Sequence, residues 1–186
     1  MAEVHSARFS IDVMGFGAQQ ASDMLAGSHP LFSELLVAEM PEIAALNVGA
    51  ATRCSATDAT AMMRGLAYTL DPMVWEPIRA VLQVAAPGLI SYTDYIQFHT
   101  DRPGWVCRTE WSGVPGIPTD AVQIAVRMRA TDDAVGCRLD YELAVRCTLP
   151  LVGGLVERSI ASTFQRTCQR LPRVMQAYFS AFDKPL

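Results

Sequence analysis

Two segments in the second half of the chain alternate between apolar and polar side chains. In Ala121–Thr131 and again in Gly136–Cys147, every second residue is apolar, and most of the residues between them are charged or polar. Side chains of a β-strand point alternately to its two faces, so each segment predicts a strand with one covered and one wet face. The turn residues Asp132–Ala134 separate the two strands, which indicates an antiparallel sheet.

Strand patterns also occur earlier in the chain, in segments with β-branched or aromatic residues. They are Arg8–Met14, Ile43–Thr52, Thr57–Leu70, Ser91–Asp101 and Trp105–Trp111. The last two are separated only by an Arg-Pro-Gly turn, which predicts a hairpin. The chain as a whole therefore predicts a sheet of about seven strands.

Helical patterns lie on either side of these strands. We expect short helices at Ala18–Leu25 and Leu31–Met40, and a kinked or split helix at Asp71–Gly88, which has an internal proline. Leu151–Phe182 repeats its apolar residues at helical spacing, with a kink expected at Pro172. A helix of ~30 residues is about 45 Å long, which matches the width of a seven-stranded curved sheet.

This order of elements predicts a single α+β domain over residues 1–186, in which a curved antiparallel sheet wraps around the long C-terminal helix. One helix covers the concave side of such a sheet only in part, which leaves room for a cavity. Hydrophobic residues make up 51% of the chain and charged residues 18%, whereas an average domain has about 25% charged residues. The apolar excess fits a large core, a cavity lining or a partner surface.

The segment CTLPLVGGLVERSIASTF (Cys147–Phe164) carries a more specific signal. Its Pro150–Gly154 element, followed by Glu157, resembles the junction between the last strand and the long helix in a START-like family best known from actinobacteria. The sequence TEW (Thr109–Trp111) is also similar to that family. The element order resembles the wider START-like, helix-grip (SRPBCC) superfamily, which includes aromatase/cyclase enzymes, plant pathogenesis-related hydrophobe carriers and lipid-transfer domains. The resemblance implies a helix-grip fold and an apolar ligand, but no particular reaction.

Two adjacent glycines at this junction allow two interpretations. Gly153 and Gly154 are poor helix formers, each costing about 1 kcal/mol relative to alanine, so another requirement must favour small residues there. Close packing of the helix start on the sheet is the favoured interpretation. A mobile helix start that gates a cavity is the alternative.

Large aromatic residues are the first candidates for a ligand-binding surface. Such side chains combine a broad apolar face with, in most cases, one polar atom, which suits an apolar pocket with a few orienting contacts. Each one taken alone is better explained as ordinary core, but in this fold some members of the group should contact a ligand. The candidates are Tyr92, Trp105, Trp111, Tyr141 and Phe164.

Two charged residues on strands are further candidates. Arg64 shares a strand face with apolar neighbours, and if that face is inward it needs an anionic partner such as a ligand head group or Asp94. An Arg64 side chain that extends to solvent at a sheet edge is the simpler alternative. His99 is a candidate general base, although a solvent-facing strand position is the favoured interpretation.

Small hydroxyl residues recur at four-residue intervals on the long helix. Ser159, Thr163 and Thr167 lie near its apolar stripe, where they would leave space beneath the helix and offer hydrogen bonds to a ligand. A position on the border between the wet and dry faces is the alternative.

Several classes of protein and site are not indicated. A net charge of −4 without basic clusters argues against nucleic-acid binding. The five cysteines have no zinc-binding spacing and predict reduced, mostly buried thiols in a reducing compartment. The chain shows no signal peptide or membrane-spanning run, so we expect a cytoplasmic protein. No catalytic, metal-binding or cofactor motif is recognised.

Three functional hypotheses remain open. The leading one is a carrier or sensor of a lipid or other apolar small molecule, for which transient contact with a membrane is compatible. The second is a cyclase, dehydratase or hydrolase that uses the same cavity and would need Arg64, Asp94, His99 or Tyr141 to meet within hydrogen-bond reach. The third is an interaction module that uses exposed apolar segments at Pro87–Ile90 or in the 112–120 loop. The sequence does not determine the ligand or the oligomeric state.

Overall fold

The structure, a computed structural model, describes residues 5–41, 43–70, 90–111, 118 and 120–182. Its sheet contains the strands β1 (His5–Met14), β2 (Ile43–Val48), β3 (Thr52–Arg53), β4 (Ala61–Leu70), β5 (Ile90–His99), β6 (Trp105–Trp111), β7 (Val122–Asp133) and β8 (Gly136–Cys147). The described helices are α1 (Ala18–Leu25), α2 (Pro30–Glu39) and α4 (Gly153–Phe182). The predicted α+β helix-grip architecture is confirmed.

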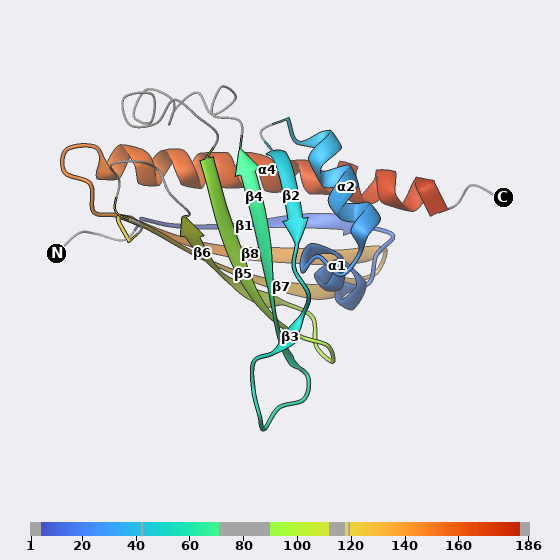
Figure 1. Ribbon diagram of the computed structural model, residues 1–186. Coiled ribbons are helices and arrows are strands. Elements are labelled where there is room, and N and C mark those ends of the chain that lie inside the picture. The colour runs from blue at the N-terminus through green and yellow to red at the C-terminus, as the bar shows by residue number, and fades with distance from the viewer. Residues whose placement is uncertain (1–4, 42, 71–89, 112–117, 119, 183–186) are drawn as a thin grey trace.

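All strand pairs in the sheet are antiparallel, and the order is β1-β8-β7-β6-β5-β4-β2. The short β3 also pairs with β4, beyond the point where β2 leaves it, so the sheet is seven strands wide. The first strand therefore lies beside the last one, and the sheet curves strongly between β8 and β4 (Figure 1).

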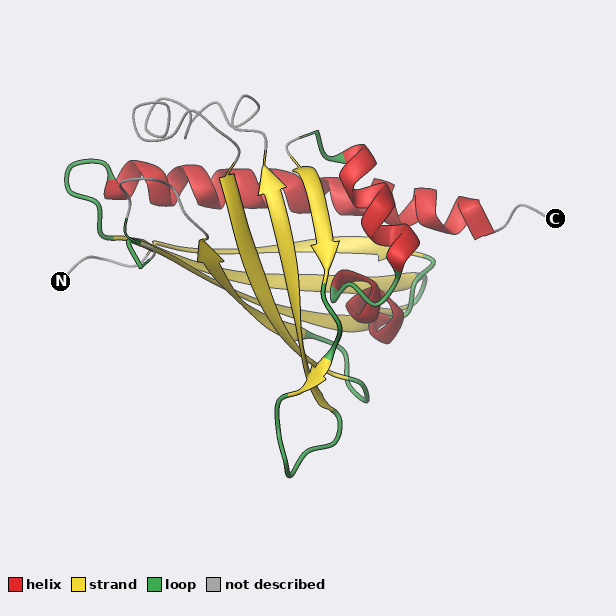
Figure 2. Cartoon of the chain, viewed as in Figure 1, coloured by secondary structure: helices red, strands yellow, loops and turns green. Residues whose placement is uncertain are grey.

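The long helix α4 runs across one face of the sheet, and α2 packs beside it (Figure 2). The buried side chains of α4 recur at helical spacing and face β1, β8 and α2. They include Val156, Ile160, Cys168, Leu171, Val174 and Met175. The helix continues through Pro172 as one element. No described helix is both long enough and apolar enough to cross a membrane.

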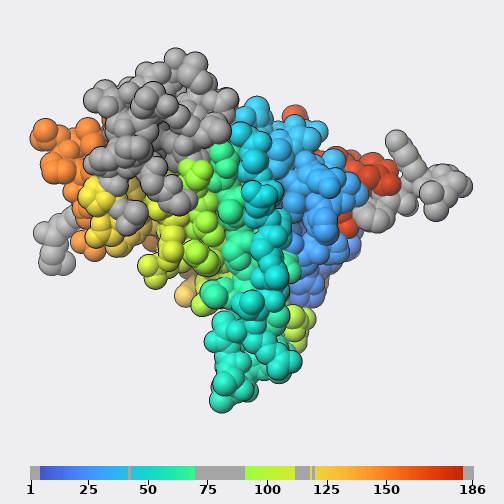
Figure 3. Space-filling view, in the orientation of Figure 1, coloured from blue at the N-terminus to red at the C-terminus, as the bar shows by residue number. Residues whose placement is uncertain are grey.

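Some predicted boundaries differ from the structure. The expected strand Ile43–Thr52 is divided into β2 and β3, because the pairing with β4 shifts by one residue: Val48 pairs with Leu66, whereas Thr52 pairs with Met63. Residues 54–60 form a loop, so the strand expected from Thr57 begins only at Ala61; Figure 3 shows this loop projecting away from the rest of the molecule. The expected helix at Asp71–Gly88 lies outside the described residues.

The junction between β8 and α4 is tightly packed. A Cβ atom on Gly153 would lie 2.7 Å from the Cys147 carbonyl oxygen, whereas a Cβ on Gly154 would meet nothing closer than 3.7 Å. The buried Glu157 carboxylate accepts a hydrogen bond of 2.8 Å from the Cys147 backbone N–H. Close packing therefore accounts for Gly153, while a Cβ on Gly154 would only reach ordinary van der Waals contact with the Arg158 side chain.

The cysteines are all free thiols, four of them buried and Cys54 exposed.

Candidate ligand-binding pocket

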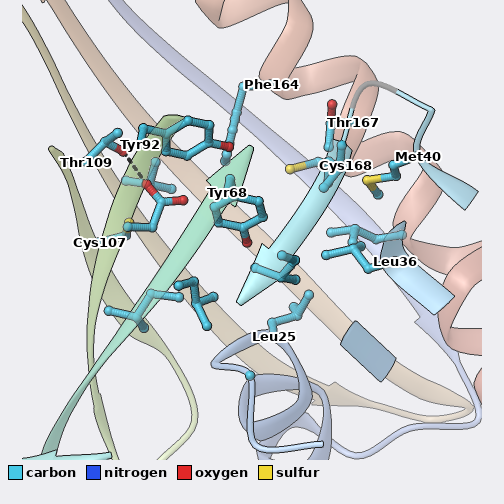
Figure 4. A pocket seen from close by; sticks show the side chains of 18 of the residues that line it. Leu25, Leu36, Met40, Tyr68, Tyr92, Cys107, Thr109, Phe164, Thr167 and Cys168 are labelled. Atoms are coloured by element: carbon cyan, nitrogen blue, oxygen red, sulfur yellow. Dashed lines mark hydrogen bonds between the residues drawn. The ribbon is translucent and has the colours of Figure 1, made fainter. Parts of the chain in front are cut away.

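A pocket of about 170 Å³ lies between the inner face of the sheet and the helices α2 and α4. We call it the inner pocket. Figure 4 shows side chains from both sides of it: Tyr68, Tyr92, Cys107 and Thr109 from the strands, Leu25 from α1, Leu36 from α2, Met40 just after α2, and Phe164, Thr167 and Cys168 from α4. Most of this wall is apolar, so the pocket suits a molecule with little polarity.

The strand wall is built by the alternation of β4, β5 and β6. Alternate residues of these strands point to the concave face, and the antiparallel register aligns them in rows across the sheet. Tyr68, Tyr92 and Trp111 form one row, and Leu66, Asp94 and Thr109 form the next.

The three aromatic side chains of the first row are in contact with one another. The rings of Tyr68 and Tyr92 stack with centroids 4.9 Å apart, and the ring of Trp111 lies 5.4 Å from that of Tyr92. Such cross-strand aromatic pairs stabilise a sheet, and here they also form a continuous aromatic surface on one side of the pocket.

Asp94 is the one acidic residue among the described residues that line the inner pocket. Its carboxylate accepts a hydrogen bond from the Thr109 hydroxyl, drawn as a dashed line in Figure 4, and the Cys107 thiol also hydrogen-bonds to it. Burial raises the pKa of Asp94 to about 6, because desolvation outweighs these two hydrogen bonds. The group therefore changes charge near neutral pH.

The helix wall is the part of α4 from Ile160 to Leu171. Thr163, Phe164 and Thr167 all line the pocket. Ser159 does not: it lies one turn before Thr163, beyond the end of the pocket, and its hydroxyl is buried without a hydrogen-bond partner among the described residues. The four-residue spacing identified the correct helix face, but it could not show where along the helix the pocket begins.

Trp105 and Tyr141 line the pocket with their rings. Tyr141 stacks on Phe9 at 5.2 Å and packs edge-on against Phe164 at 5.9 Å and Trp105 at 6.2 Å. The Tyr141 hydroxyl and the indole nitrogens of Trp105 and Trp111 are buried and have no hydrogen-bond partner within the described part of the chain. These residues therefore present apolar surface to the pocket.

Arg64 faces inward, which is the alternative in which it needs a partner, yet it is not among the residues lining the pocket. Its guanidinium donates to the carbonyl oxygen of Ala26, at 3.1 Å, and to the Ser28 hydroxyl, at 3.2 Å, and it lies over the ring of Phe98. It thus binds at the C-terminal end of α1, where a helix favours a cation. The suggested pairing of Arg64 with Asp94 is wrong, because Arg64 lies further along β4 and is held by α1.

His99 lies on the opposite face of the sheet from the pocket. Its ring contacts Asp58 at 3.5 Å, Arg102 and the Thr60 hydroxyl, at the base of the loop that Figure 3 shows projecting from the molecule. Alternation along β5 places its odd-numbered residues outward, whereas Asp94 points inward. Arg64, Asp94, His99 and Tyr141 therefore do not assemble into one cluster.

Sequence reasoning missed several residues of the pocket, above all Tyr68, Cys107, Thr109 and Cys168. Two of them had a usable signal: Cys107 and Thr109 alternate with Trp105 and Trp111, both already candidates, so they had to share the inner face.

Comparisons with known proteins agree with this architecture. A family model described as "Protein of unknown function (DUF2505)" matches residues 100–179, which is less than half of the chain. No curated protein sequence matches the chain. Solved structures do match over nearly its whole length.

Three of the similar structures are informative. Ara h 8.0201 aligns with a TM-score of 0.58 at 8% identity, over 96% of this chain and 99% of its own. A START superfamily protein from Mycobacterium smegmatis has a TM-score of 0.54 at 13% identity, over 94% and 98% of the two chains. The aromatase/cyclase ZhuI from Streptomyces sp. R1128 has a TM-score of 0.52 at 10% identity, over 92% and 91%.

The chain has the START-like, helix-grip fold. At these identities the similarity establishes the START-like architecture alone. The ligand and any reaction have to be argued from the residues of the site.

Proposed function

We propose that this START-like chain binds a small apolar molecule in the inner pocket. The observation that carries the proposal is the pocket itself: a space of about 170 Å³ with a largely apolar wall, placed between the sheet and α4. Buried apolar space of ~150 Å³ is large enough to hold benzene, whereas pockets for drug-sized ligands are about 300–1,000 Å³. The dimensions favour a molecule of about one ring over a lipid chain.

The expected affinity follows from the area that such a ligand buries. An aromatic ring with a short substituent buries roughly 200 Å², worth about 5 kcal/mol at 25 cal/mol per Å². A gain of about 5 kcal/mol alone would correspond to a Kd of about 0.2 mM, and the cost of association reduces this gain, so a single-ring probe should bind with a Kd of about 1 mM or weaker. A natural ligand with well-placed polar groups would bind more tightly.

The catalytic alternative has weaker support. One similar structure is an aromatase/cyclase, so the fold is compatible with a reaction. However, among the described residues Arg64 and His99 lie away from Asp94, and no assembled acid–base pair lines the pocket. The interaction-module hypothesis rests on segments that lie mostly outside the described residues. The buried free thiols are compatible with our proposal of a reducing, cytoplasmic location.

The first test is native mass spectrometry of the purified protein, followed by organic extraction of any bound molecule. The second is titration with toluene, followed by NMR chemical-shift changes of the pocket residues. Thr163→Trp would fill the pocket from α4, and Gln165→Trp places the same side chain on the exposed side of that helix. We expect T163W to abolish toluene binding and Q165W to retain it. Equal binding by both variants, or a lack of toluene binding by the unmodified protein, would refute the proposal.

A further inference from the structure

The carboxylate of Asp94 faces the inner pocket. The protein surrounds this group almost completely, yet part of the residue remains accessible, and Asp94 is among the pocket-lining residues. The accessible part must therefore lie on the pocket side. A polar ligand atom in the pocket can therefore reach the carboxylate.

No cation of the described chain neutralises Asp94. Its partners are the neutral Thr109 hydroxyl and the Cys107 thiol. Arg64, which the sequence suggested as a partner of Asp94, instead binds Ala26 and Ser28 at the end of α1. A buried carboxylate without a counter-ion is costly when ionised, and within the described part of the chain no positive charge balances Asp94.

The aromatic row lies directly beside this carboxylate. Asp94 is two residues from Tyr92 on the same face of β5, and Thr109 is two residues from Trp111 on β6. Aromatic faces attract cations through their electron-rich centres, and this attraction is stronger where water is excluded. A carboxylate next to an aromatic surface is a combination that favours an organic cation.

We propose that the ligand of the inner pocket is a small protonated amine attached to an apolar ring, with its ammonium group donating to the Asp94 carboxylate. This inference rests on the proposed function and names its ligand class. The ring would occupy the apolar space toward α4, and the ammonium would lie between Asp94 and the aromatic row.

The pH dependence follows from the groups around Asp94. The titratable groups beside it are Tyr92 on the same strand, Tyr68 on β4 and Cys107 on β6, and Cys168 lines the same pocket from α4. Burial raises the pKa of Tyr68, Cys107 and Cys168, so these three groups stay neutral near pH 7. Asp94 alone then changes charge: with a pKa of about 6, roughly a tenth of it is ionised near pH 5 and nearly all near pH 7.5.

The test compares three probes of matched size: toluene, benzyl alcohol and benzylamine. Isothermal titration calorimetry near pH 7.5 should show benzylamine binding at least about tenfold more tightly than either neutral probe, since hydrogen bonds to charged groups are the strong ones. Near pH 5, benzylamine remains protonated while Asp94 is mostly neutral, so its affinity should fall about tenfold. Toluene affinity should stay constant across the same pH range.

Asp94→Asn supplies the matched variant, because it keeps the shape and removes the charge. We expect D94N to bind toluene as before and to lose the preference for benzylamine. Thr109→Val, which removes the hydrogen bond to the carboxylate, should move the midpoint of the pH dependence upward. Should D94N fail to fold, the pH series on the unmodified protein still decides the question.

The outcomes separate this inference from the proposed function. Equal affinity for all three probes near pH 7.5, an amine preference that persists in D94N, or a benzylamine affinity that does not fall between pH 7.5 and pH 5 would overturn the amine assignment and leave the pocket proposal intact. Failure of all three probes to bind would instead refute the pocket proposal.

Discussion

The two glycines at the start of α4 offer a sharp test of how this junction is built. Gly153→Ala would place a methyl group 2.7 Å from the Cys147 carbonyl oxygen, so the backbone of β8 or α4 has to move. Gly154→Ala would place the same group where the nearest atom is 3.7 Å away. Neither glycine has a positive φ angle, so alanine is compatible with both backbone conformations.

The expected free energies of unfolding differ in sign. Alanine at a compatible position stabilises a protein by about 0.4–1 kcal/mol, mainly because the unfolded chain has less conformational freedom. Overpacking a close contact costs about 1–3 kcal/mol. We therefore expect G154A to be more stable than the unmodified protein by about 0.5 kcal/mol and G153A to be less stable by about 1–2 kcal/mol.

Urea unfolding, followed by circular dichroism, measures both values, and thermal unfolding provides a second scale. A difference of about 2 kcal/mol corresponds to roughly 4–8 °C in Tm for a chain of this size. Equal stability of the two variants, or a G153A protein more stable than the unmodified one, would refute the close-packing explanation. In that case a mobile helix start, in which both glycines serve flexibility, would explain the pair better.

Three further predictions address buried polar groups. Glu157→Ala removes the acceptor of the Cys147 N–H and should cost about 1–3 kcal/mol of stability in urea unfolding. Glu157→Gln should lose less, because its side-chain oxygen can still accept this hydrogen bond. Equal losses in the two variants would contradict this role of Glu157. Tyr141→Phe removes a buried hydroxyl that has no partner among the described residues, so thermal unfolding should show an unchanged or higher Tm, and a large loss would reveal a missing partner. Asp94 has a pKa raised from 3.8 to about 6 in the folded protein, so its contribution to stability is fully present below about pH 4 and is lost as the pH rises through 6, by about 3 kcal/mol in total. Measured from pH 4 to pH 8, the stability of D94N relative to the unmodified protein should therefore rise with pH, and a constant difference would rule this out.

Much of the fold could be predicted because its elements differ in hydrophobic period. The alternation in residues 121–131 and 136–147 identified β7 and β8, and the helical spacing of residues 151–182 identified α4 within two residues of its start. The division of β2 from β3 was missed, since it depends on a one-residue shift in their pairing with β4, a strand further along the chain.

The site was predicted less completely than the fold. Thr163, Phe164 and Thr167 lie on the pocket because helical spacing identifies a face. Ser159 obeys the same spacing and lies outside, because the pocket occupies only part of the length of α4. Arg64 and Asp94 are both inward residues of neighbouring strands, yet only Asp94 reaches the pocket.

The sequence by itself determined the order of strands and helices, the apolar face of each, and the junction at which the long helix begins, because these are local properties of period and composition. Only the tertiary structure decided that Asp94 lies in a row with Leu66 and Thr109, that Arg64 is held by α1, and that His99 is on the outer face. The physical reason is that a cross-strand register and the curvature of a sheet arise from pairings between distant segments. A local pattern gives the face of a residue, but it does not give the neighbours that the residue meets there.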